Sequence, residues 1–219
     1  VMGHEMMCES SGPGVIISHD GGATWERTED ANLQSLGILD MAVDPDDVDT
    51  AYAATWTNLY KTSDGGGSWS VLTGLPGGLP IRAVAVSPHN GQHVLAGVEG
   101  AGVYYSTNGG QSWQAGVAGL EPNSSLHDII YDPVDPQVVY CSDYFSGVYR
   151  STDGGVTWTK INDGLTVRAA RGLSISGDGQ HLYAAIDGGR VCRLDLNGEP
   201  PPLPPRWDLF LPVVIRDLP

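Results

Sequence analysis

Basic residues are scarce in this chain, and that scarcity excludes several classes of function. Its 219 residues include 11 Lys and Arg against 26 Asp and Glu, which gives a net charge of −15 at pH 7. Binding to nucleic acid or to anionic lipid requires a basic face, because phosphate groups must be neutralised. We therefore expect no nucleic-acid partner.

Long apolar runs and clustered cysteines are also missing. No stretch approaches the roughly 20 apolar residues that a membrane helix needs, so we expect no membrane span. Residues 1–3 (VMG) do not begin a secretory leader. Cys8, Cys141 and Cys192 have no metal-ligand spacing, and we expect no metal or cofactor. We interpret them as buried free thiols, with one disulfide plus a free thiol as the alternative if the chain is exported.

Glycine and proline are abundant, with 30 and 15 residues, and they accompany a repeated phrase. Four copies of this phrase recur at intervals of about 44 residues, which is typical of a repeat architecture. They begin at Ser18, Thr62, Ser106 and Ser151 and read SHDGGATW, TSDGGGSW, STNGGQSW and STDGGVTW. Each unit is expected to bury its apolar faces against its neighbours.

The second repeat predicts four short strands, at residues 38–44, 50–55, 59–63 and 68–72. Four short strands joined by turns at this period are typical of one blade of a β-propeller. Register carried to the N-terminus places residues 5–9 in a second strand, so the first blade lacks its inner strand.

The C-terminal residues are predicted to supply that missing strand. Residues 1–198 form the blades, residues 199–205 are a proline-rich spacer, and residues 206–219 contain the closing strand. That strand contains the apolar residues Leu211, Val213, Val214 and Ile215. The predicted fold is therefore an all-β, five-bladed propeller closed by its own C-terminus. The same strand can instead pair with a second copy, which would be self-association.

The repeated phrase resembles the Asp-box, or BNR repeat, which reads Ser/Thr-x-Asp-x-Gly-x-Thr/Ser-Trp. Its acid is expected to cap the turn, its glycine to take positive φ, and its tryptophan to pack beneath. The matching residues are Ser18, Asp20, Gly22, Trp25, Asp64, Gly66, Trp69, Asn108, Gly110, Trp113, Asp153, Gly155 and Trp158. Asn108 retains a capping oxygen but cannot be a catalytic acid, which favours a structural role for the phrase.

The resemblance implies relatives among sialidases, xyloglucan-active glycosidases, sortilin-type receptors and photosystem-assembly propellers, most of which are exported or lumenal. A sialidase would need an arginine triad and an Arg-Ile-Pro motif, and residues 80–82 (PIR) reverse that order. A xyloglucan-active glycosidase uses two carboxylates across a cleft between two propellers, and one propeller is predicted here. Our main prediction is thus a non-enzymatic, secreted scaffold or adhesive surface, with a glycosidase fragment as one alternative.

A second alternative is a module that binds a glycan or a protein. Propeller topology places the loops between second and third strands on the same face as the links between blades. That face is expected to present Trp56, Glu99, His127, Tyr144 and Phe145. Aromatic rings beside polar groups suit sugar stacking, although the same rings can instead fill gaps between blades. The acidic residues 44–49 are interpreted as a solvated turn and not as a calcium site.

Overall fold

The computed structural model of the chain describes residues 15–27, 33, 36–196 and 208–210. These residues form five antiparallel sheets and contain no helix, which confirms the predicted all-β class. Four of the sheets have four strands, and the first has two. Among the described residues no helix is long and apolar enough to cross a membrane.

The strands follow chain order within every sheet. Sheet one has β1 (Ile16–Ile17) and β2 (Glu26–Arg27), and sheet two has β3 (Ile38–Val43), β4 (Ala51–Thr55), β5 (Leu59–Thr62) and β6 (Ser70–Val71). Sheet three has β7 (Ile81–Ser87), β8 (Asn90–Val98), β9 (Gly102–Ser106) and β10 (Gln114–Gly116). Sheet four has β11 (Leu126–Tyr131), β12 (Val139–Asp143), β13 (Gly147–Ser151) and β14 (Thr159–Lys160). Sheet five has β15 (Ala170–Ile175), β16 (His181–Ile186), β17 (Arg190–Asp195) and β18 (Asp208–Phe210).

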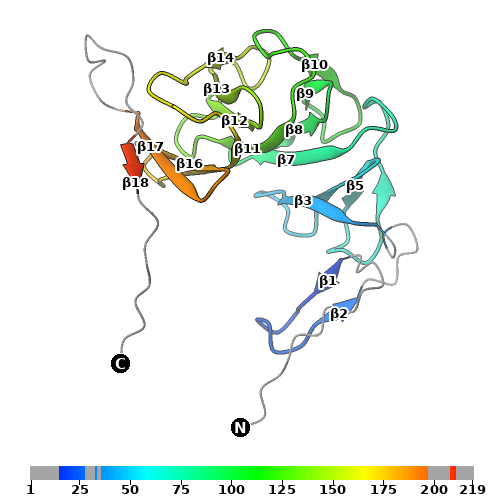
Figure 1. The fold of residues 1–219 in the computed structure, drawn as a ribbon. Helices are drawn as coiled ribbons and strands as arrows, with labels where there is room; N and C mark the ends of the chain where they lie inside the picture. The colour runs from blue at the N-terminus through cyan, green and yellow to red at the C-terminus, as the bar shows by residue number, and fades with distance from the viewer. Residues whose placement is uncertain (1–14, 28–32, 34–35, 197–207, 211–219) are drawn as a thin grey trace, which may run out of the picture.

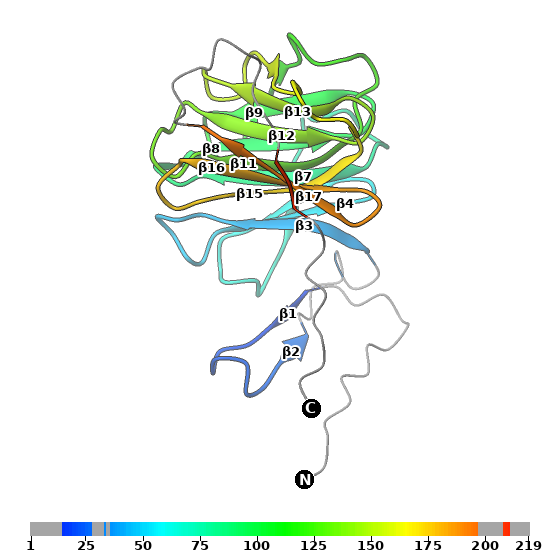
Figure 2. The ribbon, with the colours of Figure 1, turned by 60° about the vertical axis from the view of Figure 1, so that its left-hand side comes forward.

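The sheets are arranged as blades around an open arc (Figure 1). The first strands of successive sheets lie side by side, β3 against β7, β7 against β11 and β11 against β15. Sheet one and sheet five lie at opposite ends of the arc and are separated from each other (Figure 1). Figure 2 shows sheet one below the other sheets. The described residues therefore show a propeller-like arrangement of blades without a closed ring.

Apolar side chains fill the space between neighbouring sheets. Between sheets three and four, Leu95 and Val103 pack in one buried cluster with Ile129 and Tyr149. Equivalent clusters lie between sheets two and three and between sheets four and five. Each blade is thus stabilised chiefly by its neighbours, as expected of a repeat fold. Cys141 and Cys192 lie in these clusters as free, buried thiols, which confirms that prediction for both.

Each Asp-box is a tight turn held by its own side chains. In the second box, Asp64 Oδ1 accepts a hydrogen bond from the Ser68 N–H at 2.9 Å, and Oδ2 accepts one from the Ser68 hydroxyl at 2.6 Å. The Gly66 N–H donates to Thr62 Oγ1 at 3.0 Å, and Gly66 has a φ of 95°, which favours glycine. The Ser68 hydroxyl bond and its companions lower the pKa of Asp64 to about 2.

The third box shows how asparagine replaces aspartate. Asn108 Oδ1 accepts a hydrogen bond from the Ser112 N–H at 2.9 Å, as the carboxylates do in the other boxes. Its Nδ2 donates to the Ser112 hydroxyl oxygen at 2.9 Å, so this hydroxyl accepts a bond where its counterparts donate one. A serine hydroxyl can take either role, which is why the turn is retained.

The box tryptophans differ in burial more than their shared motif suggests. Trp69 and Trp158 are 3% and 4% exposed, whereas Trp25 is 59% exposed. The Trp158 indole N–H donates to the Gly116 carbonyl of the preceding sheet at 3.0 Å. No described residue provides a sheet before sheet one, so Trp25 packs only beneath its own turn.

The C-terminal strand lies in a position that the sequence did not predict. Residues 208–210 form β18, the fourth strand of sheet five, in antiparallel pairing with β17. This part of the predicted closing segment is therefore at the outer edge of sheet five and not at the inner edge of sheet one. A reason is that β17 has an unpaired edge directly before the spacer, and the nearest edge costs the least loop entropy to reach. Leu211, Val213, Val214 and Ile215 lie outside the described residues, as do Cys8 and residues 5–9.

Two inner-strand carboxylates connect neighbouring blades. Asp40 Oδ2 accepts a hydrogen bond from the Val84 N–H of the next sheet at 2.8 Å, and Asp128 Oδ2 accepts one from the Leu173 N–H at 2.7 Å. Burial raises the pKa of Asp128 from 3.8 to about 6, and the charge of Asp40 contributes in the same direction. Because the folded state binds this proton more tightly than the unfolded state, stability falls as pH rises between about 4 and 6.

Replacing Asp128 with asparagine is expected to remove that pH dependence. The amide oxygen still accepts the Leu173 N–H, while the buried charge is gone. At pH 7 the variant should be more stable by about 1–3 kcal/mol, with little difference at pH 4. Urea unfolding at both pH values measures this. Asp64→Asn is the contrasting variant. Folding lowers the pKa of the Asp64 carboxyl, so the ionised carboxylate stabilises the fold, and the variant should be less stable than the unaltered protein above pH 4.

Candidate functional site

One face of the arc carries both the hairpin loops and the links between sheets. The Gly100 N–H of the β8–β9 loop donates to the Ser124 carbonyl of the link before β11 at 2.8 Å. The Asp187 N–H of the β16–β17 loop donates to the Ala169 carbonyl of the link before β15 at 2.8 Å. We call this side of the molecule the loop face.

The residues predicted for binding all lie on the loop face, in or beside these loops. They are Trp56, Glu99, His127, Tyr144 and Phe145. Trp56 is 52% exposed and Phe145 is 73% exposed, so neither ring fills a gap between blades. The His127 and Tyr144 rings contact each other, with their centroids 5.7 Å apart.

A bulge in each inner strand directs a further side chain to the loop face. The pairing register shifts by one residue near the start of each of these four strands. A bulge of this kind leaves one residue unpaired and changes the direction of its side chain. The residues that the shift skips are Leu39, Arg82, His127 and Arg171.

Arg82 joins two neighbouring blades on the loop face. Its guanidinium carbon lies 5.3 Å from the centre of the Trp56 ring, which belongs to the preceding sheet. The same side chain is ion-paired with Glu99 of its own sheet. Glu99 also accepts a hydrogen bond from the Ser125 hydroxyl at 3.3 Å. The exposed indole is thus fixed in position by a cation–π contact.

Arg171 repeats this arrangement one pair of blades further along. Its guanidinium carbon lies 4.9 Å from the centre of the Tyr144 ring, and its Nε is 3.2 Å from Asp187 Oδ1. The Tyr144 hydroxyl donates to Asp187 Oδ2 at 2.8 Å. The hydrogen bond from Arg171 is the main cause that lowers the pKa of Asp187. Burial, together with Arg82 and Arg171, lowers the pKa of His127 and so favours its neutral form.

Asp143 breaks the repeat pattern at the end of a second strand. It is the last residue of β12 to pair before the hairpin loop, and the matching positions in sheets three and five are Val98 and Ile186. All three side chains are buried, and Asp143 is 1% exposed. A carboxylate therefore occupies a position where sheets three and five place an apolar side chain, while sheet two places the buried Thr55, whose hydroxyl oxygen accepts the Thr57 and Asn58 N–H groups.

Only one of the two Asp143 oxygens bonds to a residue that the structure describes. Oδ1 accepts bonds from the Phe145 N–H at 3.0 Å, the Ser146 N–H at 2.7 Å and the Ser146 hydroxyl at 2.5 Å. Oδ2 is buried and has no hydrogen-bond partner among the described residues. The turn itself is held by Asn162, whose amide donates to the Ser146 carbonyl at 2.6 Å. Asp143 is thus rigidly positioned with one acceptor oxygen unused.

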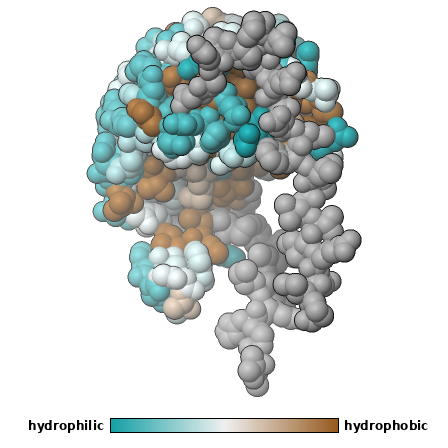
Figure 3. Space-filling model, turned by 90° about the vertical axis from the view of Figure 1, so that its left-hand side faces the viewer, coloured by the Kyte–Doolittle hydropathy of each residue, from teal (hydrophilic) through white to brown (hydrophobic). Residues whose placement is uncertain are grey.

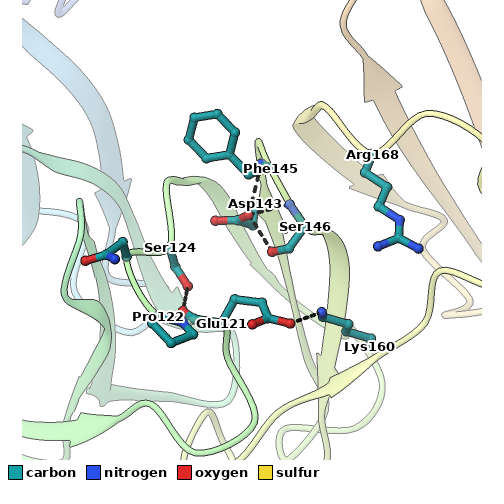
Figure 4. A pocket seen from close by; sticks show the side chains of 9 residues that line it. Glu121, Pro122, Ser124, Asp143, Phe145, Ser146, Lys160 and Arg168 are labelled. Carbon is teal, nitrogen blue, oxygen red and sulfur yellow. Dashed lines mark hydrogen bonds and ion pairs between the residues drawn. The ribbon is translucent and has the colours of Figure 1, made fainter.

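A pocket of about 420 Å³ lies beside Asp143 on the loop face (Figure 4). Its walls come from the link before β11, the β12–β13 loop, β14 and the link before β15. Figure 4 shows Lys160 and Arg168 on one side of the pocket and Ser124 on the other. The lining residues are Glu121, Pro122, Asn123, Ser124, Asp143, Phe145, Ser146, Lys160 and Arg168.

Keeping Asp143 in this position has a cost. A carboxylate that is buried without a charged partner destabilises a protein by several kcal/mol. The cap on the turn uses Oδ1 alone, and a buried carboxylate with a second oxygen left over beside a pocket is a candidate for a functional site. The sequence analysis did not select Asp143, although an alignment of the four repeats places this acid where the others have Thr55, Val98 and Ile186.

The described residues contain no group of three or more His, Cys, Asp and Glu side chains that could hold a metal ion. In the acidic turn after β3, Asp44 Oδ1 accepts the Asp46 N–H at 2.9 Å, and Asp47 Oδ2 accepts the Thr50 hydroxyl at 2.9 Å. The acids of this turn therefore cap its backbone.

Comparison with known proteins identifies two family models. The model for "Sortilin, neurotensin receptor 3" matches residues 57–171, more than half of the chain, and the BNR/Asp-box repeat model matches residues 16–27. A curated xyloglucanase from a Paenibacillus species is 28% identical over 107 residues, which are 48% of this chain and 10% of that protein. The chain therefore spans about a tenth of that relative.

Solved structures show the same fold. An ancestral GH74 enzyme superposes with a TM-score of 0.74 at 24% identity, covering 92% of this chain and 28% of its own. YCF48 from Cyanidioschyzon merolae superposes with a TM-score of 0.58 at 15% identity, covering 83% of this chain and 58% of its own. These likenesses show a propeller-like fold, and the match to the BNR/Asp-box repeat model confirms the predicted resemblance to BNR-type propellers.

The comparisons correct our main functional prediction. A xyloglucanase and a GH74 enzyme are among the relatives, so the prediction of a non-enzymatic scaffold is wrong, and so is the prediction that the chain is no enzyme. The error arose because the single predicted propeller was taken to exclude an enzyme whose two carboxylates face each other across two propellers, and because Asp143, directly after a predicted strand at residues 138–142, was not considered. The alternative of a glycosidase fragment agrees better with the relatives.

Proposed function

We propose that this chain, which belongs to the Sortilin-Vps10 family, supplies one wall of the active site of a glycosidase acting on xyloglucan or a related β-glucan. The observation that carries this proposal is Asp143, a buried carboxylate with an unused oxygen beside a pocket. The curated xyloglucanase relative supports the choice of substrate class.

Asp143 is proposed as one of the two carboxylates that glycoside hydrolysis requires. Three donors hold Oδ1, so Oδ2 is the atom that exchanges a proton with water or with the leaving sugar oxygen. The second carboxylate would come from the opposite wall of a cleft, on a part of the polypeptide outside this sequence. The small share of the relatives that this chain covers supports such a division.

The loop-face aromatics are proposed to bind the polysaccharide chain. Trp56 and Phe145 are the most exposed rings there, and arginine contacts fix Trp56 and Tyr144. Flat rings held in place suit the apolar faces of glucose units, since little entropy is lost on binding. A polysaccharide such as xyloglucan is found outside cells, so the protein is proposed to be exported.

Release of reducing ends from xyloglucan tests this function. The polypeptide that carries this chain together with its opposite wall is expected to hydrolyse xyloglucan and to leave a sialoside intact. A folded protein that releases nothing from xyloglucan or from other β-glucans would remove the proposal.

A ring of five blades, closed by residues 213–215, stays a structural proposal. It is supported by an uncovered apolar surface on β3: Met41 and Val43 are 43% and 56% exposed, whereas Val84, which matches Met41 in sheet three, is 3% exposed. Figure 3 shows hydrophobic side chains gathered where sheet one meets sheet two.

Removing residues 211–219 tests this closure. If the segment covers β3, the shortened chain should melt several degrees below the intact chain. The reason is that covering the apolar side chains of β3 is expected to contribute about 2 kcal/mol to stability. An unchanged melting temperature would exclude closure. A dimer of the intact chain that the deletion abolishes would place the segment in a second copy.

A further inference from the structure

The loop-face pocket contains one arginine whose charge no described residue neutralises. The Arg168 side chain makes no ion pair or hydrogen bond within the part of the chain that the structure describes. Lys160, the other base of the pocket, is ion-paired with Glu121. In a chain with only 11 basic residues and a net charge of −15, an arginine that lines a pocket and is ion-paired with neither of its acids, Glu121 and Asp143, indicates that its partner comes with a ligand.

Asp143 adds an independent requirement on that ligand. Asp143 lines the same pocket, and its Oδ2 is buried and lacks a partner among the described residues. A carboxylate oxygen accepts hydrogen bonds and donates none when it is ionised. The ligand must therefore present a hydroxyl or another donor toward Asp143 and an anionic group toward Arg168.

We propose that this pocket is a subsite for an acidic sugar, a uronic acid residue within a glycan. The sugar carboxylate pairs with the Arg168 guanidinium, whose planar fork matches a carboxylate. One ring hydroxyl donates to Asp143 Oδ2, which keeps its second lone pair free for water. The exposed Phe145 ring beside the turn covers the apolar face of the sugar. The choice of a glycan rests on the proposed function.

Other small ligands satisfy fewer of these groups. A neutral sugar satisfies Asp143 but leaves Arg168 unpaired. Inorganic phosphate satisfies Arg168 but brings two negative charges beside a buried carboxylate, which repels them. A uronic acid carries one negative charge and several hydroxyl donors on one rigid ring, so it matches both groups together. The inference thus predicts a preference for acidic over neutral oligosaccharides.

Calorimetric titration of the protein measures this preference. The probes are a neutral β-glucan oligosaccharide and the same oligosaccharide with one glucuronic acid branch. The acidic probe is expected to bind about tenfold more tightly at low salt, the gain of one charged hydrogen-bonded pair. The advantage should shrink as salt screens the charge. Free glucuronate is a third probe, and weak binding of it would show that the polymer supplies the remaining contacts.

Matched arginine variants assign the preference to the pocket. Arg168→Gln should bind both oligosaccharides equally, and Arg190→Gln, which removes the same charge from an exposed hairpin of sheet five, should keep the tenfold difference. Equal binding of both probes by the unaltered protein, or a preference that survives in Arg168→Gln, would overturn the inference. Hydrolysis of neutral xyloglucan without any acid preference would leave the proposed function intact and remove only this subsite.

Discussion

Replacing Asp143 with asparagine is expected to lower the rate of xyloglucan hydrolysis by a factor of about 10²–10⁴, the usual contribution of a general acid or base. Asparagine has nearly the same shape, and its amide oxygen still accepts the Phe145 and Ser146 N–H groups that the carboxylate holds. What the variant lacks is an oxygen that can take up a proton. The turn after β12 should therefore keep its structure, while hydrolysis becomes much slower.

The control is a second capping aspartate in the same sheet. Asp132, on the opposite face in the β11–β12 turn, is 7% exposed, and its Oδ1 accepts the Val134 N–H at 2.8 Å and the Asp135 N–H at 3.1 Å. Asp132→Asn should change activity less than about twofold, because Asp132 lies away from the loop face and its role as a turn cap is kept by the amide oxygen. If the Asp143→Asn variant is folded and as active as the unaltered protein, Asp143 has no part in the reaction.

Removing the Trp158 indole is expected to give the largest loss of stability. The ring is 4% exposed, and its N–H donates to the Gly116 carbonyl of sheet three. The backbone N–H of Trp158 also donates to the Ala118 carbonyl at 2.8 Å, so this residue joins two blades. Trp158→Ala should lower the free energy of unfolding by about 3–5 kcal/mol, the range for large buried rings.

Trp25 offers the matched comparison within the same motif. Its indole is 59% exposed and lies beside Gly22 of its own turn, so Trp25→Ala should cost less than about 1 kcal/mol. Urea unfolding of both variants, followed by circular dichroism, measures the difference. Similar losses in the two variants would mean that the tryptophan acts within its own turn and not between blades.

Repetition made much of this fold predictable. The four boxes, spaced by about one blade, predicted the tight turns at Gly66 and its counterparts and the four-strand sheets around them. Propeller topology then placed Trp56, Tyr144 and Phe145 on one face before any coordinates were known. These features follow from local geometry: a glycine turn, a capping side chain and alternating apolar residues act within a few residues of each other.

The chemistry of the site came from contacts that local pattern does not contain. Arg82 and Arg171 reach the loop face because a one-residue bulge redirects them, and sequence spacing alone does not show a bulge. The sequence places Asp143 just after a predicted strand at residues 138–142, and nothing in its spacing indicates that it is buried with an oxygen that no described residue bonds. Trp25 and Trp158 share a motif yet differ in burial, because a neighbouring blade covers one and none of the described residues covers the other. Burial and partnership are properties of the packed blades, and they depend on residues about 40 positions apart or more.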